Sequence, residues 1–135
     1  MFSVEVNVGR LLEIRLAAPI TLEDLQGMGQ ALGEIFHKHQ GRLVSAADAT
    51  RAAIVSTDVG ARVVDVFRTD NPRIERSGIL INQSATFGLQ IERLVAKAEN
   101  KARRCFHDAF ELKAFLGTLL TRAEHARLAQ FLSER

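Results

Sequence analysis

The first residues of the chain alternate between apolar and polar side chains in two short runs. Residues 2–8 and 11–16 each repeat with a period of two, which is typical of strands that bury one face. Gly9 and Arg10 separate the runs, and a two-residue break that contains glycine favours a tight β-hairpin. The sequence therefore predicts that the fold begins with an antiparallel pair of strands.

The rest of the chain alternates between helical and strand-like patterns. Apolar residues at steps of three and four indicate amphipathic helices, and residues able to cap a first turn precede them. Short apolar segments between them favour buried strands. In chain order, the pattern predicts a helix from Thr21 to Gly41, a strand at 42–47, a loop at 48–50, a helix between Ser56 and Asn71, a strand at 74–81, a helix between Ser84 and Asn100, a strand at 103–107 and helices after Asp108 and Thr121.

Two helices carry further local signals. The first is expected to face the core with one stripe, made of Leu22, Leu25, Gly29, Leu32 and Phe36. The same helix contains three glycines, which either allow close packing on a sheet or form a helix–helix contact in a dimer: Gly27, Gly29 and Gly33. Near the end of the chain, the spacing predicts two capping boxes, Asp108 with Glu111 and Thr121 with Glu124.

Strands separated by helices imply right-handed crossovers and a mainly parallel sheet. We therefore expect an α/β fold with a mixed, mainly parallel five-stranded sheet, whose first strand is antiparallel at an edge. Residues 1–135 form a single domain in this interpretation, and residues 121–135 add a C-terminal helix. That helix is expected to bury Leu128, Phe131 and Leu132.

Composition limits the class of protein. The 135 residues are 47% hydrophobic and 25% charged, values typical of one globular domain. A formal charge of +2 gives little support to nucleic-acid binding, and no apolar run approaches the roughly 20 residues of a membrane span. With one cysteine and no pattern of a signal peptide, the expected location is the cytoplasm.

Catalytic and cofactor-binding motifs are missing from the sequence. Its glycines do not form a phosphate-binding loop, and His37 and His39 lie on opposite sides of a helix, so they cannot share a metal ion. Cys105 is either a small buried apolar residue or a thiol activated by neighbouring cations. The basic residues from Arg93 to Arg104 fit a solvated surface better than a nucleic-acid site. We expect no enzyme activity, no cofactor and no metal ion.

The order of elements over residues 2–119 resembles the STAS superfamily, in particular the bacterial SpoIIAA-like proteins grouped with sporulation anti-anti-sigma factors and Sec14-type lipid carriers. The resemblance rests on the opening hairpin, on residues 16–21 leading into the first helix, on residues 43–67 and on the short strand before Asp108. It implies a mixed sheet with helices mostly on one face and the other face partly open. It also implies a non-enzymatic regulator that binds proteins, although some members bind nucleotides or apolar ligands.

Residues 54–60 correspond to the phosphorylated segment of the regulated STAS proteins. In those proteins Asp-Ser is followed by Ser or Thr and by Gly at the start of the second helix. Here Ser56 and Thr57 lie near the phosphoacceptor position, but Asp58 follows them and Gly60 comes late. Ser56 therefore either contributes to a regulatory site or only caps the helix.

Two hypotheses for function follow. In the first, the protein is a regulatory or scaffold module that binds a protein partner and self-associates as a homodimer, through an exposed surface around the second and third helices. The candidate residues for that surface are Ser56, Thr57, Arg62, Phe87 and Arg93. In the alternative, the protein is a carrier or sensor of a small apolar ligand or nucleotide, held between sheet and helices.

Overall fold

Five strands form one mixed sheet in the order β1-β2-β3-β4-β5 in the computed structural model, which describes residues 1–134. The first two strands make the expected antiparallel hairpin, and each later strand runs parallel to its neighbour. The fold class predicted from the sequence is therefore confirmed. The strands are β1 (Phe2–Val6), β2 (Leu11–Ala17), β3 (Leu43–Arg51), β4 (Ile74–Ile81) and β5 (Arg103–Phe106).

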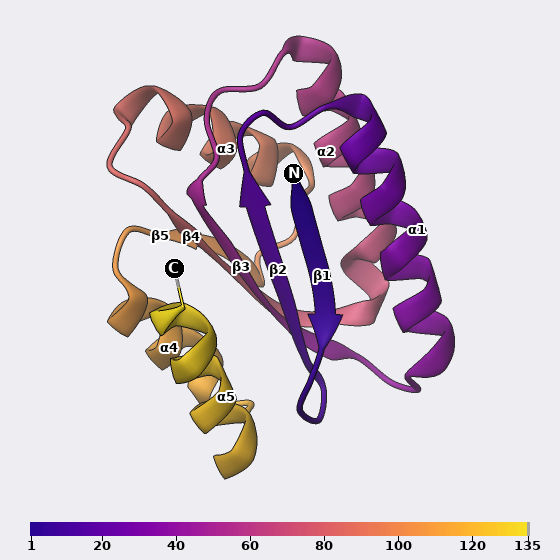
Figure 1. Cartoon of the computed structure of the whole chain (residues 1–135), viewed down its shortest axis with the longest axis vertical. Helices are drawn as coiled ribbons and strands as arrows, with labels where there is room; N and C mark the ends of the chain where they lie inside the picture. The colour runs from indigo at the N-terminus through magenta and orange to yellow at the C-terminus, as the bar shows by residue number, and fades with distance from the viewer. Residues whose placement is uncertain (135) are drawn as a thin grey trace.

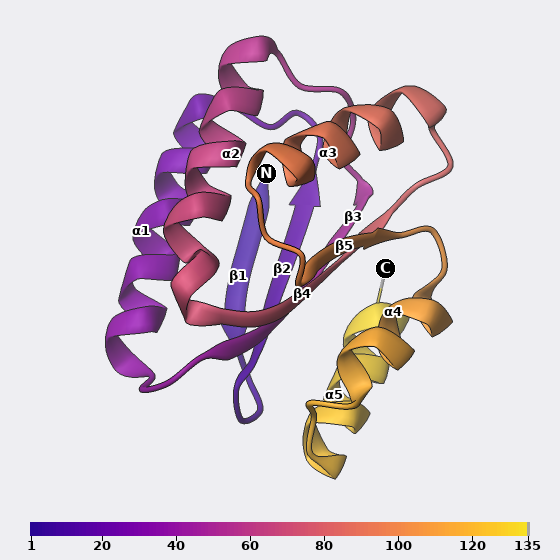
Figure 2. The same ribbon diagram turned by 180° about the vertical axis from the view of Figure 1, so that it is seen from behind.

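Helices cover both faces of this sheet (Figures 1 and 2). One face packs against α1 (Leu22–Lys38), α2 (Thr57–Asp70) and α3 (Ala85–Lys97), and a short 3-10 turn, η1 (Asn71–Arg73), follows α2. The opposite face packs against α4 (Ala109–Gly117) and α5 (Arg122–Ser133). The sheet is thus covered more completely than the resemblance implies, because α4 and α5 occupy the face expected to be partly open.

The C-terminal helix is part of the folded core. Its apolar stripe is buried as predicted, with Leu128, Phe131 and Leu132 each at most 2% exposed. These side chains join Leu112 and Leu116 of α4 against the sheet. Among residues 1–134, no helix is long and apolar enough to cross a membrane.

Strand β3 is longer than the sequence pattern indicates. Residues 48–50 were expected to form a loop, but they continue the strand between β2 and β4. Asp48 pairs in register with Arg15 and accepts a hydrogen bond from its guanidinium at 2.9 Å. Pairing on both sides overrides the weak strand propensity of aspartate, because strand preference depends strongly on context.

The first helix buries a slightly different stripe from the expected one. Leu25, Met28 and Leu32 are buried, whereas Leu22 is half exposed and Gly29 faces open space. Gly27 does allow close packing on the sheet, since a Cβ there would lie 3.1 Å from the Phe2 ring. A Cβ at Gly33 would meet nothing within 4 Å, so packing on the sheet does not require glycine there.

Most predicted caps are present. Thr21 and Asp24 form a capping box at α1, as Thr121 and Glu124 do at α5. The expected box between Asp108 and Glu111 at α4 is wrong within residues 1–134, because Asp108 caps the helix through the Phe110 amide instead of the Glu111 amide and Glu111 makes no return bond. In each case a side-chain oxygen satisfies an amide that the helix itself leaves free.

Candidate functional site

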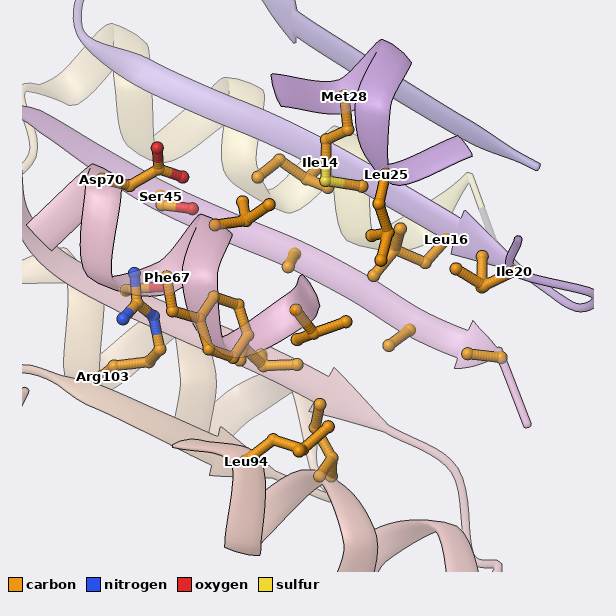
Figure 3. A pocket seen from close by; sticks show the side chains of 18 of the residues that line it. Ile14, Leu16, Ile20, Leu25, Met28, Ser45, Phe67, Asp70, Leu94 and Arg103 are labelled. Carbon is orange, nitrogen blue, oxygen red and sulfur yellow. The ribbon is translucent and has the colours of Figure 1, made fainter. Parts of the chain in front are cut away.

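A cavity of about 80 Å³ lies between the sheet and helices α1, α2 and α3 (Figure 3). Aliphatic and aromatic side chains from all three helices and the sheet form most of its walls. Figure 3 shows Leu16, Ile20 and Leu25 towards one end of the cavity and Asp70, Ser45 and Arg103 at the other. The space therefore has an apolar body and a polar end.

Small side chains on β3 leave this space open. Residues at alternate positions of a strand point to the same face, so Ser45, Ala47 and Ala49 all face α1–α3. The bulkier side chains around them, including Met28 and Phe87, line the cavity without filling the space above the two alanines. A run of small residues in the central strand is thus the direct cause of the cavity.

The polar end is a row of side chains across three neighbouring strands. Ser45 of β3 pairs in register with Ser77 of β4, and Ser77 pairs with Arg103 of β5. All three side chains line the cavity and are at least 95% buried. Asp70, the last residue of α2, lines this end on the side of the helices and is also buried. Among residues 1–134, the hydroxyls of Ser45 and Ser77 make no hydrogen bond.

Arg103 is held in place but is incompletely bonded. Its guanidinium lies over the Phe67 ring, 4.2 Å from the centroid, and Nη1 donates to Asn71 Oδ1 at 2.8 Å. Its Nε is buried and has no hydrogen-bond partner in the described part of the chain. Burial lowers the pKa of Arg103 to about 10, so the group remains cationic at neutral pH. A buried donor without a partner is rare in proteins and costly.

Asp70 faces the same end without a direct bond to Arg103. Within residues 1–134, neither an ion pair nor a hydrogen bond joins the two side chains, although their charges interact. Burial raises the pKa of Asp70 to about 7, and the positive charge of Arg103 opposes that rise. The cavity end therefore combines a cationic donor with a carboxyl group that changes protonation near neutral pH.

A second depression, the α2–α3 groove, lies on the outer surface. Its lining includes three of the residues proposed from the sequence, Ser56, Thr57 and Arg93, and the depression has a volume of about 650 Å³. Ile54 and Leu89 are about half exposed beside it. Gln90 holds the two sides together, because its amide exchanges two hydrogen bonds with the backbone of Val55 at 2.8 and 2.9 Å.

The remaining predicted contact residues do not line this groove. Arg62 is exposed on α2, with a weak ion pair to Asp65 at 3.8 Å. Phe87 is only 4% exposed and lines the cavity, so its proposal as a surface contact is wrong. Its position on the apolar stripe of α3 points it towards the sheet. Ser56 is the N-cap of α2 and accepts from the Val59 amide at 3.2 Å.

The structure also shows the surroundings of Cys105 and of the basic run from Arg93 to Arg104. Cys105 is half buried, and burial raises the pKa of its thiol to about 11, which disfavours a reactive thiolate. No group of three potential metal ligands occurs among residues 1–134. The assignment of the whole basic run to a solvated surface is wrong at Arg103, which points into the cavity rather than into solvent.

No pattern in the sequence predicts that Asp70 and Arg103 lie at the same end of a cavity. Alternation along β5 could have indicated that Arg103 and Cys105 share a face, because the two are separated by one residue. Placing Arg103 beside Ser77 also requires the register between β4 and β5, which only the folded structure supplies. Asp70 comes directly before Asn71-Pro72, and no sequence pattern there distinguishes a site residue from an ordinary polar residue.

Comparison of the chain with models of protein families gives no match, and no curated protein matches it significantly.

Proposed function

We propose that the protein binds a small, mainly apolar molecule in the cavity between the sheet and α1–α3, as a carrier or sensor. The observation that carries this proposal is the cavity itself, since protein interiors are usually packed without spaces larger than a water molecule. An empty apolar space loses contacts that a bound apolar molecule restores. Away from the polar end at Asp70 and Arg103, its walls also offer few polar groups to hold ordered water.

The size of the cavity limits the ligand. A water-sized group needs roughly 10–15 Å³ of such space, so the cavity accommodates about five to eight of them. Small hydrocarbon-like molecules meet this limit, and longer ones require α1–α3 to move away from the sheet. A nucleotide is not part of the proposal, because the cavity supplies one buried cation and no phosphate-binding loop.

Binding without catalysis is the proposed activity. The polar groups at the cavity end have no nucleophile–base pair among them, and neither serine is hydrogen-bonded to a general base within residues 1–134. The STAS resemblance agrees with this proposal, since that superfamily consists largely of regulators and includes members that bind apolar ligands.

The experiment is a titration of methyl-labelled protein with pentane, followed by NMR. Methyl signals that line the cavity, such as those of Ile79 and Leu94, should shift together and saturate, whereas Val6 serves as a methyl outside it. Ala47→Leu fills the space and should abolish these shifts. Ala61→Leu, in the α2–α3 groove, adds the same volume outside the cavity and should leave them unchanged. Shifts that persist in Ala47→Leu would contradict the proposal.

The α2–α3 groove supports a second candidate function, the binding of a protein partner. Half-exposed Ile54 and Leu89 lie beside the cations Arg93 and Lys97, an arrangement suited to a segment with apolar and acidic side chains. A second copy of the chain is the partner proposed from the sequence, as a homodimer.

This candidate is tested by the oligomeric state. Sedimentation at micromolar to millimolar concentrations should show a dimer, and Leu89→Asp should convert it to a monomer because a charge is placed on the apolar rim. Phe110→Asp is the matched control, since Phe110 is an exposed aromatic on α4, which packs on the opposite face of the sheet from α2 and α3. A monomer of about 15 kDa for the parent protein at all concentrations would exclude self-association.

A further inference from the structure

The polar end of the cavity contains a buried hydrogen-bond donor for which no neighbouring group in the described part of the chain acts as acceptor. Arg103 Nε is a buried donor without a partner, and the side chain is 5% exposed. Beside it, the Ser45 and Ser77 hydroxyls and the Asp70 carboxyl line the same end of the cavity and make no hydrogen bond among residues 1–134. A buried donor is normally paired in a folded protein, so the unpaired Nε beside these groups indicates a site for a polar group.

We propose that this end of the cavity recognises the hydroxyl group of a small apolar alcohol, whose hydrocarbon part fills the space above Ala47. This inference rests on the proposed ligand binding and names the ligand class. The alcohol oxygen accepts a hydrogen bond from Arg103 Nε, and its O–H group donates a hydrogen bond to the Asp70 carboxylate. Ser45 and Ser77 lie in the same row and provide further donors or acceptors.

The charges of the two ionisable groups favour a neutral head group. At pH 8, where Asp70 is mainly ionised, an anionic head group is attracted by Arg103 but repelled by Asp70. A cationic head group is attracted by Asp70 but repelled by Arg103. Either ion also loses its hydration on entering a cavity with apolar walls, which is expensive. A hydroxyl group donates one hydrogen bond and accepts another, so it satisfies both partners without adding a charge.

The length of the ligand follows from the layout of the sheet. Along the strands, the polar row of Ser45, Ser77 and Arg103 is followed by an apolar row that includes Ala47 and Ile79, and then by Ala49. Residues two apart on one face are separated by roughly 6.6 Å. A chain of four carbons attached to the hydroxyl reaches from the polar row to the row of Ala47 but not to Ala49, so 1-butanol is a suitable probe.

The test compares probes of equal size with different ends. Pentane, 1-butanol, butylammonium and propanoate each have five non-hydrogen atoms, and each is titrated at pH 8 against methyl- and nitrogen-labelled protein by NMR. We expect 1-butanol to bind at least tenfold more tightly than the other three. It should also shift the Arg103 Nε–H signal, which pentane leaves in place.

Two variants separate recognition of the hydroxyl group from binding of the chain. Arg103→Met keeps an apolar stem but removes the donor, so 1-butanol should lose its advantage while pentane binds as before. Ser77→Ala is the milder change and should weaken 1-butanol two- to fivefold without affecting pentane. If Arg103→Met does not fold, Ser77→Ala and the Nε–H signal of the parent protein still decide the question.

The outcomes distinguish this inference from the function on which it rests. If pentane and 1-butanol bind equally, apolar binding stands and the assignment of a hydroxyl group is wrong. If propanoate or butylammonium binds most tightly, the head group is an ion and the assignment is also wrong. If no probe shifts the cavity signals, both proposals fail.

Discussion

Glu13 of β2 accepts two hydrogen bonds from Arg127 of α5, at 2.6 Å from Nη2 and 2.9 Å from Nε. The carboxylate is 3% exposed, and the two residues are 114 positions apart in the chain. Two parallel bonds fix both the distance and the orientation of the groups. The pair therefore attaches the C-terminal helix to the sheet at a defined angle, beside the apolar contacts of Leu128 and Phe131.

Breaking this pair should destabilise the protein strongly. Arg127→Met leaves the Glu13 carboxylate buried without its partner, and removal of one member of a buried pair costs about 3–5 kcal/mol. Urea unfolding should show this loss, and the double variant Glu13→Leu with Arg127→Met should recover part of it because no buried charge remains. A single variant as stable as the parent would show that the pair contributes little.

Removal of α5 should have a larger effect than any single change within it. Truncation after Leu120 deletes Leu128, Phe131 and Leu132, whose burial is worth about 1.5–3 kcal/mol each, and exposes the sheet beneath them. We expect a melting temperature many degrees lower, or insoluble protein. Truncation after Glu134, which retains the buried stripe and the ion pairs of Glu134 with Arg15 and Arg127, is the control and should melt like the parent. Unchanged melting after the longer truncation would show that α5 is dispensable for folding.

Asp70 should make stability depend on pH. Burial raises its pKa to about 7 in the folded protein, whereas an unfolded aspartate titrates near 3.9. Between these values the folded state binds more protons, so stability is present in full below about pH 4 and falls as pH rises to about 7, by up to about 4 kcal/mol.

Acids with the opposite shift act at lower pH. The pKa values of Glu75 and Glu124 are lowered in the folded protein. For Glu75 the chief cause is the hydrogen bond from Arg10. For Glu124 burial raises the pKa, but the hydrogen bonds from the backbone amides of Thr121 and Arg10 together outweigh this effect. Stability from these groups is lost only as pH falls below about 4.5. Urea unfolding between pH 5 and 8 therefore excludes these two glutamates, and comparison with a variant assigns the effect to Asp70. Asp70→Asn should flatten the decline in this range, and an equally steep decline in the variant would assign the effect to another group.

A negative charge at Thr57 tests regulation at the α2–α3 groove. Thr57 is exposed in the first turn of α2, where an anion is favoured by about 0.3–1 kcal/mol, although neighbouring Asp58 opposes it. Thr57→Asp and Thr57→Ala should both fold like the parent in thermal melting. Self-association measured by sedimentation should change only in Thr57→Asp, and identical association in both variants would leave the position as a simple helix start.

Local signals in the sequence predict much of the fold. Thr21 and Thr121 begin helices because a hydroxyl three residues before an acidic side chain satisfies amides within the same turn. Nothing distant is needed for such a cap. Asp48 differs, since its place in β3 depends on Arg15 of the neighbouring strand, and the sequence pattern therefore ended the strand too early.

The candidate site was less accessible to prediction. The small residues Ser45, Ala47 and Ala49 alternate visibly along the chain, but alternation does not show that the opposing helices leave the space above them unfilled. The polar end depends on the registers of β3, β4 and β5 and on the place where α2 ends. Each of these is a relation between distant segments, which no local pattern contains.

Native mass spectrometry of protein freshly purified under non-denaturing conditions tests the proposed ligand binding most directly. The parent protein should retain a small molecule, seen as an added mass that disappears on denaturation. Ala47→Leu, which fills the cavity, should show the bare mass of its chain, and Ala61→Leu should retain the added mass. A bare mass for the parent, or an added mass that persists in Ala47→Leu, would contradict binding in the cavity.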